Sequence, residues 1–261
     1  MPVSTPSGIP SVRGVARAVT VSCALVVLGC GSSFAQTAAP SHVEPLGGIF
    51  QEVPSDLWHF LSWDTALVLG AGGAVASIGH IWDDDLSDEI DTNPSLNNAM
   101  APGNTYGAFS AQAVFGIGLY AGGWLAKNPG LARVGGDIMR AQILSQAYVQ
   151  AVKFTVQRER PDGSNNVSFP SGHSASAFAT ATVLQRHYGW KVGVPATILA
   201  AYVATARVHD NKHYLSDVIF GGAMGVAAQR TVTLHAGQYG FAVVPVAALH
   251  GGGVTVIVQP R

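Results

Sequence analysis

The chain has 261 residues, 48% of them hydrophobic, which is enough for one substantial core. Its net charge of −1 and its charged fraction of 11% argue against a basic nucleic-acid-binding surface, so we expect no nucleic-acid partner. The low charged fraction and the 31 glycines leave membrane association open.

The first 35 residues have the features of an export signal. Arg13 and Arg17 precede an apolar run that ends in small residues, a pattern that predicts cleavage before Gln36 and a periplasmic location. The alternative is lipoprotein processing before Cys30, which would leave the mature protein with a lipid anchor on that residue.

Residues 36–56 contain three prolines and are predicted to be a linker. Residues 57–235 are predicted to form one helical domain, because their apolar runs are long and show little of the alternation typical of strands. The economical fold class is an all-α, six-helix bundle. The six helices are expected at about 62–82, 106–126, 136–158, 172–187, 190–208 and 213–231.

Two features inside this domain are predicted from local composition. The acidic run at residues 83–89 lacks the glycine turn of a calcium loop, so we interpret it as a solvated loop. Gly118 with Gly122, and Gly221 with Gly225, have the four-residue spacing that allows close contacts between helices.

After the helical domain, residues 236–261 have a different pattern. Two short runs rich in β-branched residues flank His250 and three glycines, which predicts a C-terminal β-hairpin.

Three short blocks between residues 153 and 217 carry the chemistry. They are Lys153-x6-Arg160-Pro161, then Pro170-Ser171-Gly172-His173, then Arg207-x5-His213-x3-Asp217. Each block alone has an ordinary structural explanation, such as a solvated helix face or a turn before a helix. Their combination in this order is typical of a phosphate site.

The residue types fit phosphoryl transfer. Lys153, Arg160 and Arg207 supply cations for the three equatorial oxygens of a transferring phosphoryl group. Ser171 occupies an expected helix N-cap and Gly172 allows close approach of the backbone, so free N–H groups can add to the anion site. This chemistry requires no metal and no cofactor.

Two histidines can divide the catalytic work. His213 and Asp217, at positions i and i+4, are expected to share one helix face, where the carboxylate would orient the imidazole for attack on phosphorus. His173 would then protonate the leaving alcohol and later activate water. The residue pattern alone leaves open which histidine attacks.

The three blocks resemble the signature motifs of the type 2 phosphatidic acid phosphatase and vanadium haloperoxidase superfamily. The resemblance implies a metal-independent phosphatase in which His213 forms a phosphohistidine, Asp217 orients it and His173 is the acid and base. One departure is Ala206, where the family usually has serine. The implied substrate is a phosphomonoester, either soluble or a lipid phosphate.

Two other function classes remain open. A vanadium-dependent haloperoxidase would hold vanadate among the same cations, although the short chain favours the phosphatase. A non-catalytic phosphate or lipid binder is disfavoured because His173, His213 and Asp217 are all present.

The relation of the bundle to the membrane has two interpretations. We favour a cleaved signal and a water-soluble or lipid-tethered bundle, since glycine and alanine make the apolar runs only moderately hydrophobic. The alternative is an inner-membrane protein whose site faces the periplasm. Four basic residues expected at the opposite end of the bundle favour that alternative: Lys127, Arg133, Arg186 and Lys191.

Overall fold

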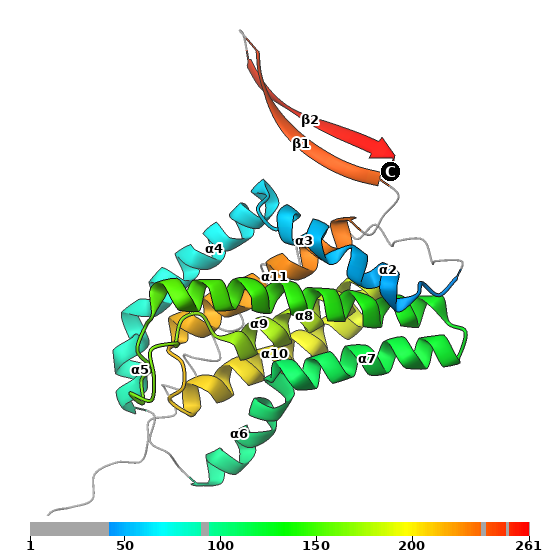
Figure 1. The fold of residues 1–261 in the computed structure, drawn as a ribbon. Coiled ribbons are helices and arrows are strands. Elements are labelled where there is room, and N and C mark those ends of the chain that lie inside the picture. Colours follow the sequence, from blue (N-terminus) through cyan, green and yellow to red (C-terminus); the bar gives the residue numbers. More distant parts are fainter. Residues whose placement is uncertain (1–41, 90–93, 236–238, 249–250, 261) are drawn as a thin grey trace, which may run out of the picture.

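The computed structural model describes residues 42–89, 94–235, 239–248 and 251–260, which form a helical bundle followed by a β-hairpin (Figure 1). The predicted export signal, its cleavage site and Cys30 lie outside the described residues. All six predicted helices are present, as α4 and α7 to α11, so the all-α bundle is confirmed. The elements are α2 (Leu46–Gln51), α3 (Val53–His59), α4 (Trp63–Gly79), η1 (His80–Trp82), α5 (Asp83–Glu89), α6 (Pro94–Gly107), α7 (Phe109–Leu125), α8 (Pro129–Val156), α9 (Gly172–Tyr188), α10 (Trp190–His209), α11 (Leu215–His235), β1 (Tyr239–Ala248) and β2 (Gly251–Pro260).

The linker predicted for residues 36–56 is too long. From Leu46 onward this stretch is helical, and Asp56 is buried against α8. Arg140 on α8 donates two hydrogen bonds to the carboxylate of Asp56, at 2.7 and 2.8 Å. Pro54 lies in the first turn of α3, where a backbone N–H would have no helical partner, so the proline is compatible with the helix.

Local sequence explains where the two central helices begin and end. Asn128 caps α8 by accepting a hydrogen bond from the Leu131 N–H at 3.0 Å, and Pro129 follows as the first helical residue. Gln157 ends α8 in a left-handed conformation. Ser171 caps α9 by accepting from the Ser174 N–H at 3.4 Å. The predicted N-cap is therefore confirmed.

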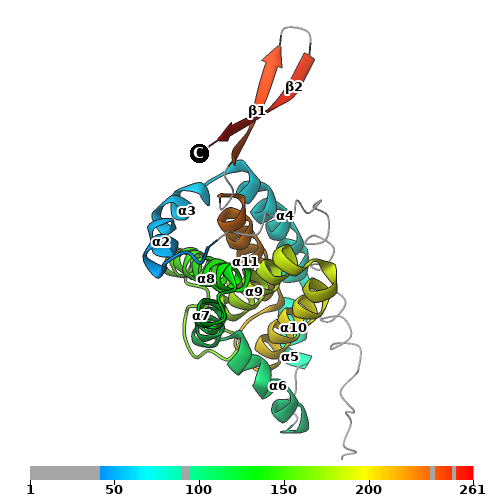
Figure 2. The ribbon, with the colours of Figure 1, turned by 90° about the vertical axis from the view of Figure 1, so that its right-hand side faces the viewer.

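Two clusters of buried apolar side chains hold the bundle together. The first joins α4, α9, α10 and α11, and the second joins α8, α9 and α11, so α9 and α11 lie at the centre of the domain. Figure 2 shows the same arrangement nearly along the helix axes, with α9 and α11 surrounded by α4, α8 and α10. The large members of the clusters include Phe178, Val203 and Ile219 in the first and Ile138, Leu144 and Val183 in the second.

Glycines set the distance between α9 and α11. A Cβ atom added at Gly221 would lie 2.4 Å from the Ser171 carbonyl oxygen, and one at Gly225 would lie 2.2 Å from the Ala175 oxygen. The close contact predicted for this pair is confirmed. The prediction for Gly118 and Gly122 is wrong, because nothing lies within 4 Å of a Cβ added at either residue.

Part of the bundle surface is strongly apolar. Trp63 and Leu67 on α4, Leu125 on α7 and Trp190 on α10 are among the large hydrophobic side chains that are exposed. Two segments, Trp63–Ser87 and Trp190–His209, are long and apolar enough to cross a membrane. In the second segment, however, half of the most apolar 18-residue stretch is buried inside the bundle.

The chain after α11 forms the two-stranded antiparallel hairpin of β1 and β2. Its register runs from Tyr239 paired with Pro260 to Ala248 paired with Gly251. Figures 1 and 2 show the hairpin beyond the end of α11.

Candidate active site

The residues of the three motifs are carried by helix ends that meet at one end of the bundle. Because α8, α9, α10 and α11 alternate in direction, the C-terminal ends of α8 and α10 lie beside the N-terminal ends of α9 and α11. Figure 1 shows these ends on the left. We call this end the site pole. It carries Lys153 in the last turn of α8, Arg160 and Ser171 in the following loop, Gly172 and His173 at the start of α9, Arg207 in the last turn of α10, His213 in the next turn and Asp217 in the first turn of α11.

Lys153 is a buried cation at this pole. Its Nζ donates a hydrogen bond to the carbonyl oxygen of Val167, in the loop between α8 and α9. The pKa of Lys153 is lowered to about 8, by burial first and also by the charges of Arg160 and Arg207, while Asp217 opposes them. The three predicted cations are therefore close enough to affect one another.

The two arginines are fixed by asparagines. Arg160 donates from Nε to the Asn165 side-chain oxygen at 2.8 Å. Arg207 donates from Nη1 to Asn104 on α6 at 2.7 Å, while its buried Nε has no hydrogen-bond partner in the described part of the chain. Arg207 Nη1 also lies 3.8 Å from the Asp210 carboxylate. Each guanidinium is thus oriented by an asparagine and retains other donors for an anion.

The N-terminus of α9 is tied to α11 next to these cations. The Ser171 N–H donates to the Asp217 carbonyl oxygen at 3.0 Å. On the other side, Gln146 of α8 donates to the Gly172 carbonyl at 3.0 Å. These bonds hold the positive end of the α9 dipole at the site pole, where an anion would be stabilised.

His213 and Asp217 form a close, almost fully buried pair. Nδ1 of His213 lies 3.6 Å from Oδ2 of Asp217, and the two side chains are 2% and 0% exposed. His213 lies in the turn before α11, so the expectation that both residues share a helix face is wrong. Burial lowers the pKa of His213 to about 4, with Lys153 and Arg207 acting in the same direction and Asp217 opposing them.

His173 faces the same group of charges from the first turn of α9. Its pKa is lowered to about 4, by burial first and then by the charges of Arg207, His213, Arg160 and Lys153. A Cβ added at Gly107 of α6 would lie 3.3 Å from the His173 ring, so α6 covers this side of the site.

The acidic run was interpreted as a solvated loop, which is wrong for its first residue. Residues 83–89 form α5, and Asp83 is 1% exposed. Asp83 accepts a hydrogen bond from Arg158 at 2.9 Å, and Arg158 donates another to Asp217 at 2.7 Å. The sequence analysis missed both residues; the only signal was the second arginine inside the first motif.

Ala206, which departs from the usual serine, is fully buried. A Cβ added at Gly103 of α6 would lie 2.9 Å from the Ala206 Cβ, so a small side chain is needed where α6 packs on α10. The neighbouring Asn104 provides a polar contact to Arg207 at this point.

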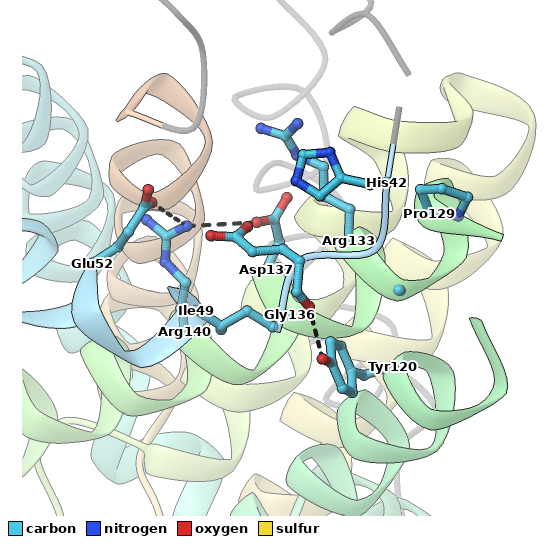
Figure 3. Close-up of a pocket in the computed structure, with 11 residues that line it drawn as sticks. His42, Ile49, Glu52, Tyr120, Pro129, Arg133, Gly136, Asp137 and Arg140 are labelled. Carbon is cyan, nitrogen blue, oxygen red and sulfur yellow. Dashed lines mark hydrogen bonds and ion pairs between the residues drawn. The ribbon is translucent and has the colours of Figure 1, made fainter. Parts of the chain in front are cut away.

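A pocket of about 290 Å³ lies at the opposite end of α8 (Figure 3). Its lining includes Glu52, Tyr120, Asp137 and Arg140, and none of the predicted site residues. Arg140 lies thirteen positions before Lys153 along α8, roughly 20 Å at 1.5 Å per residue. Within the described residues, no group of three histidine, cysteine or acidic side chains is arranged to hold a metal ion, either at this pocket or at the site pole.

Comparison with known proteins finds similarity in the motif region. Residues 137–238 match the model of the PAP2 superfamily. The chain is 40% identical over 86 residues to a lipid A 1-phosphatase of Porphyromonas gingivalis, covering 32% of this chain and 19% of that protein. It is 28% identical over 98 residues to a lipid A 4'-phosphatase of Helicobacter pylori, covering 33% and 49% respectively. The matched stretch thus spans less than half the length of either relative.

Among solved structures, the chain is similar to a transmembrane PAP2-type phosphatidylglycerolphosphate phosphatase from Bacillus subtilis. The TM-score is 0.47 and the identity 21%, over 72% of this chain and 93% of the other. The stretch that matches the PAP2 superfamily model, residues 137–238, contains all three motifs and both catalytic histidine candidates.

Proposed function

We propose that this protein is a metal-independent phosphatase that hydrolyses a phosphomonoester of a membrane lipid through a phosphohistidine intermediate. The observation that carries the proposal is the presence, at one pole, of three cations, His173 and the buried His213–Asp217 pair. We refer to Lys153, Arg160, Arg207 and the N-terminus of α9 together as the phosphate cage.

In the proposed reaction, the phosphate cage holds the non-bridging oxygens and leaves phosphorus open to in-line attack. Nε2 of His213 attacks phosphorus, the bond to the alcohol oxygen breaks, and His173 gives a proton to that oxygen. Water then attacks the phosphohistidine after His173 removes its proton. Inorganic phosphate leaves and His213 is restored. Asp217 stabilises the positive charge that the phosphorylated imidazole carries.

The acid role of His173 depends on the bound substrate. The pKa of about 4 arises from burial first and from surrounding positive charge second. A phosphate dianion between Arg207 and His173 would oppose the second cause and raise the pKa toward the working pH. Substrate binding thus supplies the charge that lets His173 hold its proton for the leaving alcohol.

The apolar surface of the bundle supports a lipid substrate. Trp63 and Leu67 on α4 and Trp190 on α10 are exposed over much of their area. Exposed large apolar side chains on more than one helix fit a surface that contacts acyl chains. The names of the two curated relatives refer to lipid A phosphates, which fits the same substrate class. We further propose that the site works on the periplasmic side, as the predicted export signal implies.

The test is phosphate release by the purified chain in detergent–lipid micelles with a chelator present. Lipid A, phosphatidylglycerol phosphate, phosphatidate and a soluble aryl phosphate would be compared. We expect release from at least one lipid phosphate, and acid-labile labelling of the protein during turnover. His213→Ala should abolish both, whereas the matched substitution His59→Ala, far from the site pole, should retain them.

Two results would overturn the proposal. Turnover like that of the wild type in His213→Ala would remove the assigned nucleophile. Halide oxidation with added vanadate and peroxide, without release of phosphate from any ester, would favour a haloperoxidase. The proposed membrane contact has a separate test, which is fractionation without detergent. A chain that stays in solution would contradict that contact.

A further inference from the structure

Arg158 links two buried carboxylates from different parts of the chain. Its Nη1 donates to Asp217 Oδ1 at 2.7 Å, and its Nη2 donates to Asp83 Oδ2 at 2.9 Å. Its guanidinium also lies 3.9 Å from the centre of the Tyr214 ring. Two carboxylates that are 1% and 0% exposed need such a partner, because an unpaired buried charge is strongly destabilising.

Asp83 also caps the helix that carries Asp217. Its Oδ1 accepts a hydrogen bond from the Ser216 N–H at 2.9 Å, and its Oδ2 accepts from the Ser216 hydroxyl. Ser216 is in the first turn of α11, where backbone N–H groups have no partner within the helix. Asp83, which lies on α5, therefore acts as an N-cap residue for α11 and fixes the start of that helix.

The two oxygens of Asp217 have different tasks. Oδ2 faces Nδ1 of His213 at 3.6 Å and accepts hydrogen bonds from the Ser168 hydroxyl and the Tyr214 N–H. Within the described part of the chain, Oδ1 accepts a hydrogen bond from Arg158 alone. Arg158 therefore fixes the second oxygen and, with it, the plane of the carboxylate behind the histidine.

The net charge of the three linked side chains suits the proposed reaction. Asp83, Arg158 and Asp217 together carry one net negative charge, and they lie on the side of His213 that Asp217 occupies. If Asp83 were neutral, Arg158 would cancel Asp217, and the phosphorylated imidazole would lose part of its stabilisation. Asp83 thus offsets the guanidinium that is needed to orient Asp217.

We infer that Asp83 and Arg158 are positioning residues of the phosphatase, which hold Asp217 in the orientation that directs His213 at phosphorus. This inference rests on the proposed function. Neither residue belongs to the phosphate cage, so both act on the chemical step rather than on the affinity for substrate.

The test separates kcat from KM. Asp83→Asn should lower kcat about tenfold or more with KM within about twofold of the wild-type value, since a small misplacement of a catalytic group costs rate rather than binding. The matched control is Asp84→Asn, because Asp84 is the next residue in the same acidic run and is exposed. It should leave both constants unchanged. Arg158→Lys retains the charge and should keep more kcat than Arg158→Met.

Two outcomes would overturn the inference. A rise in KM at unchanged kcat in Arg158→Met would make Arg158 a substrate ligand, and wild-type kcat in Asp83→Asn would remove any role for Asp83. Thermal unfolding checks whether each variant is folded. If Asp83→Asn does not fold, Ser216→Ala decides instead, because it removes the hydroxyl contact to Asp83 without leaving an unpaired charge. Wild-type kcat in Ser216→Ala would then overturn the inference.

Failure of the proposed function can be distinguished from failure of this inference. If the wild type releases phosphate from no ester, the function fails, and a proton NMR titration of the His213 ring then tests the positioning role without turnover. The titratable groups that act on this ring include Asp217, Lys153, Arg207 and His173, and Asp83→Asn leaves all of them in place. Asp83→Asn should lower the titration midpoint and Asp84→Asn should not; an unchanged midpoint in Asp83→Asn contradicts the inference.

Discussion

Replacing Gly221 by alanine should damage catalysis through packing alone. The added Cβ would lie 2.4 Å from the Ser171 carbonyl oxygen, whereas real Cβ contacts are essentially never shorter than 3.0 Å. The two backbones must therefore separate by 0.6 Å or more, from 2.4 Å to at least 3.0 Å. Ser171 caps α9 and immediately precedes Gly172 and His173, so this movement shifts part of the phosphate cage and the acid away from His213.

The expected size follows from that displacement. A misplacement of 1 Å can reduce turnover on the order of 100-fold, so kcat of Gly221→Ala should fall about 10- to 100-fold. Overpacking should also destabilise the fold by about 1–3 kcal/mol. Both quantities are measured on one preparation, as phosphate release at saturating substrate and as thermal unfolding.

Two other glycines provide matched controls. A Cβ at Gly123 would lie 2.3 Å from the Ala132 nitrogen, an equally severe clash but at the opposite end of α8, so Gly123→Ala should lose stability and keep kcat. Nothing lies within 4 Å of a Cβ at Gly118, so Gly118→Ala should keep kcat and gain up to about 1 kcal/mol from helix propensity. The reasoning is refuted if Gly221→Ala turns over like the wild type, or if Gly123→Ala loses as much kcat.

Further predictions concern charges. Because the pKa of Lys153 is about 8, the lysine loses its charge as the pH increases through that value, and KM should rise. Lys153→Arg should remove this rise. A pH-independent KM in the wild type would contradict the prediction. Asn104→Ala should lower kcat/KM about tenfold, the loss expected for a hydrogen bond to a charged group, because Arg207 would no longer be oriented. Asp56→Asn should lower the unfolding free energy by about 1–3 kcal/mol while keeping kcat, because Arg140 would lose its charged hydrogen-bond partner and keep only the ion pairs with Glu52 and Asp137. An unchanged melting temperature would argue against it.

The motif residues could be placed together from sequence because each motif combines a chemical group with a helix end. Ser171 is a good N-cap, and Arg207 precedes a turn that contains Asp210 and Asn211, so a sequence reader can put both at helix ends. Alternating helices then bring those ends to one pole. The six long helices could be predicted for a related reason, since their apolar runs are too long for strands.

The contacts that support the site were not predictable in the same way. Asp83 belongs to a run of three aspartates, of which Asp84 and Asp85 are exposed, and a charge run usually indicates a solvated surface. Only the fold shows that one of the three carboxylates meets Arg158, from a residue 75 positions away. The buried contact of Asp56 was also not predictable. The nearby prolines indicate a linker, and its partner Arg140 lies 84 positions away.

The arrangement of charges at the site pole explains why its carboxylates lie where they do. Lys153 and Arg207 lower the pKa of His213, so a carboxylate among them would neutralise the cations that a phosphate needs. Asp217 instead lies behind His213, on the side away from the phosphate cage in the proposed mechanism. Burial raises the pKa of Asp217, but the nearby His213, a hydrogen bond from Ser168 and the charge of Arg158 together lower it below its usual value. The negative charge is thus held one side chain away from phosphorus, where it acts only through the imidazole. In the proposed reaction, cations that repel one another share a single dianion, and the imidazole that would attack it has its own counter-charge fixed in advance.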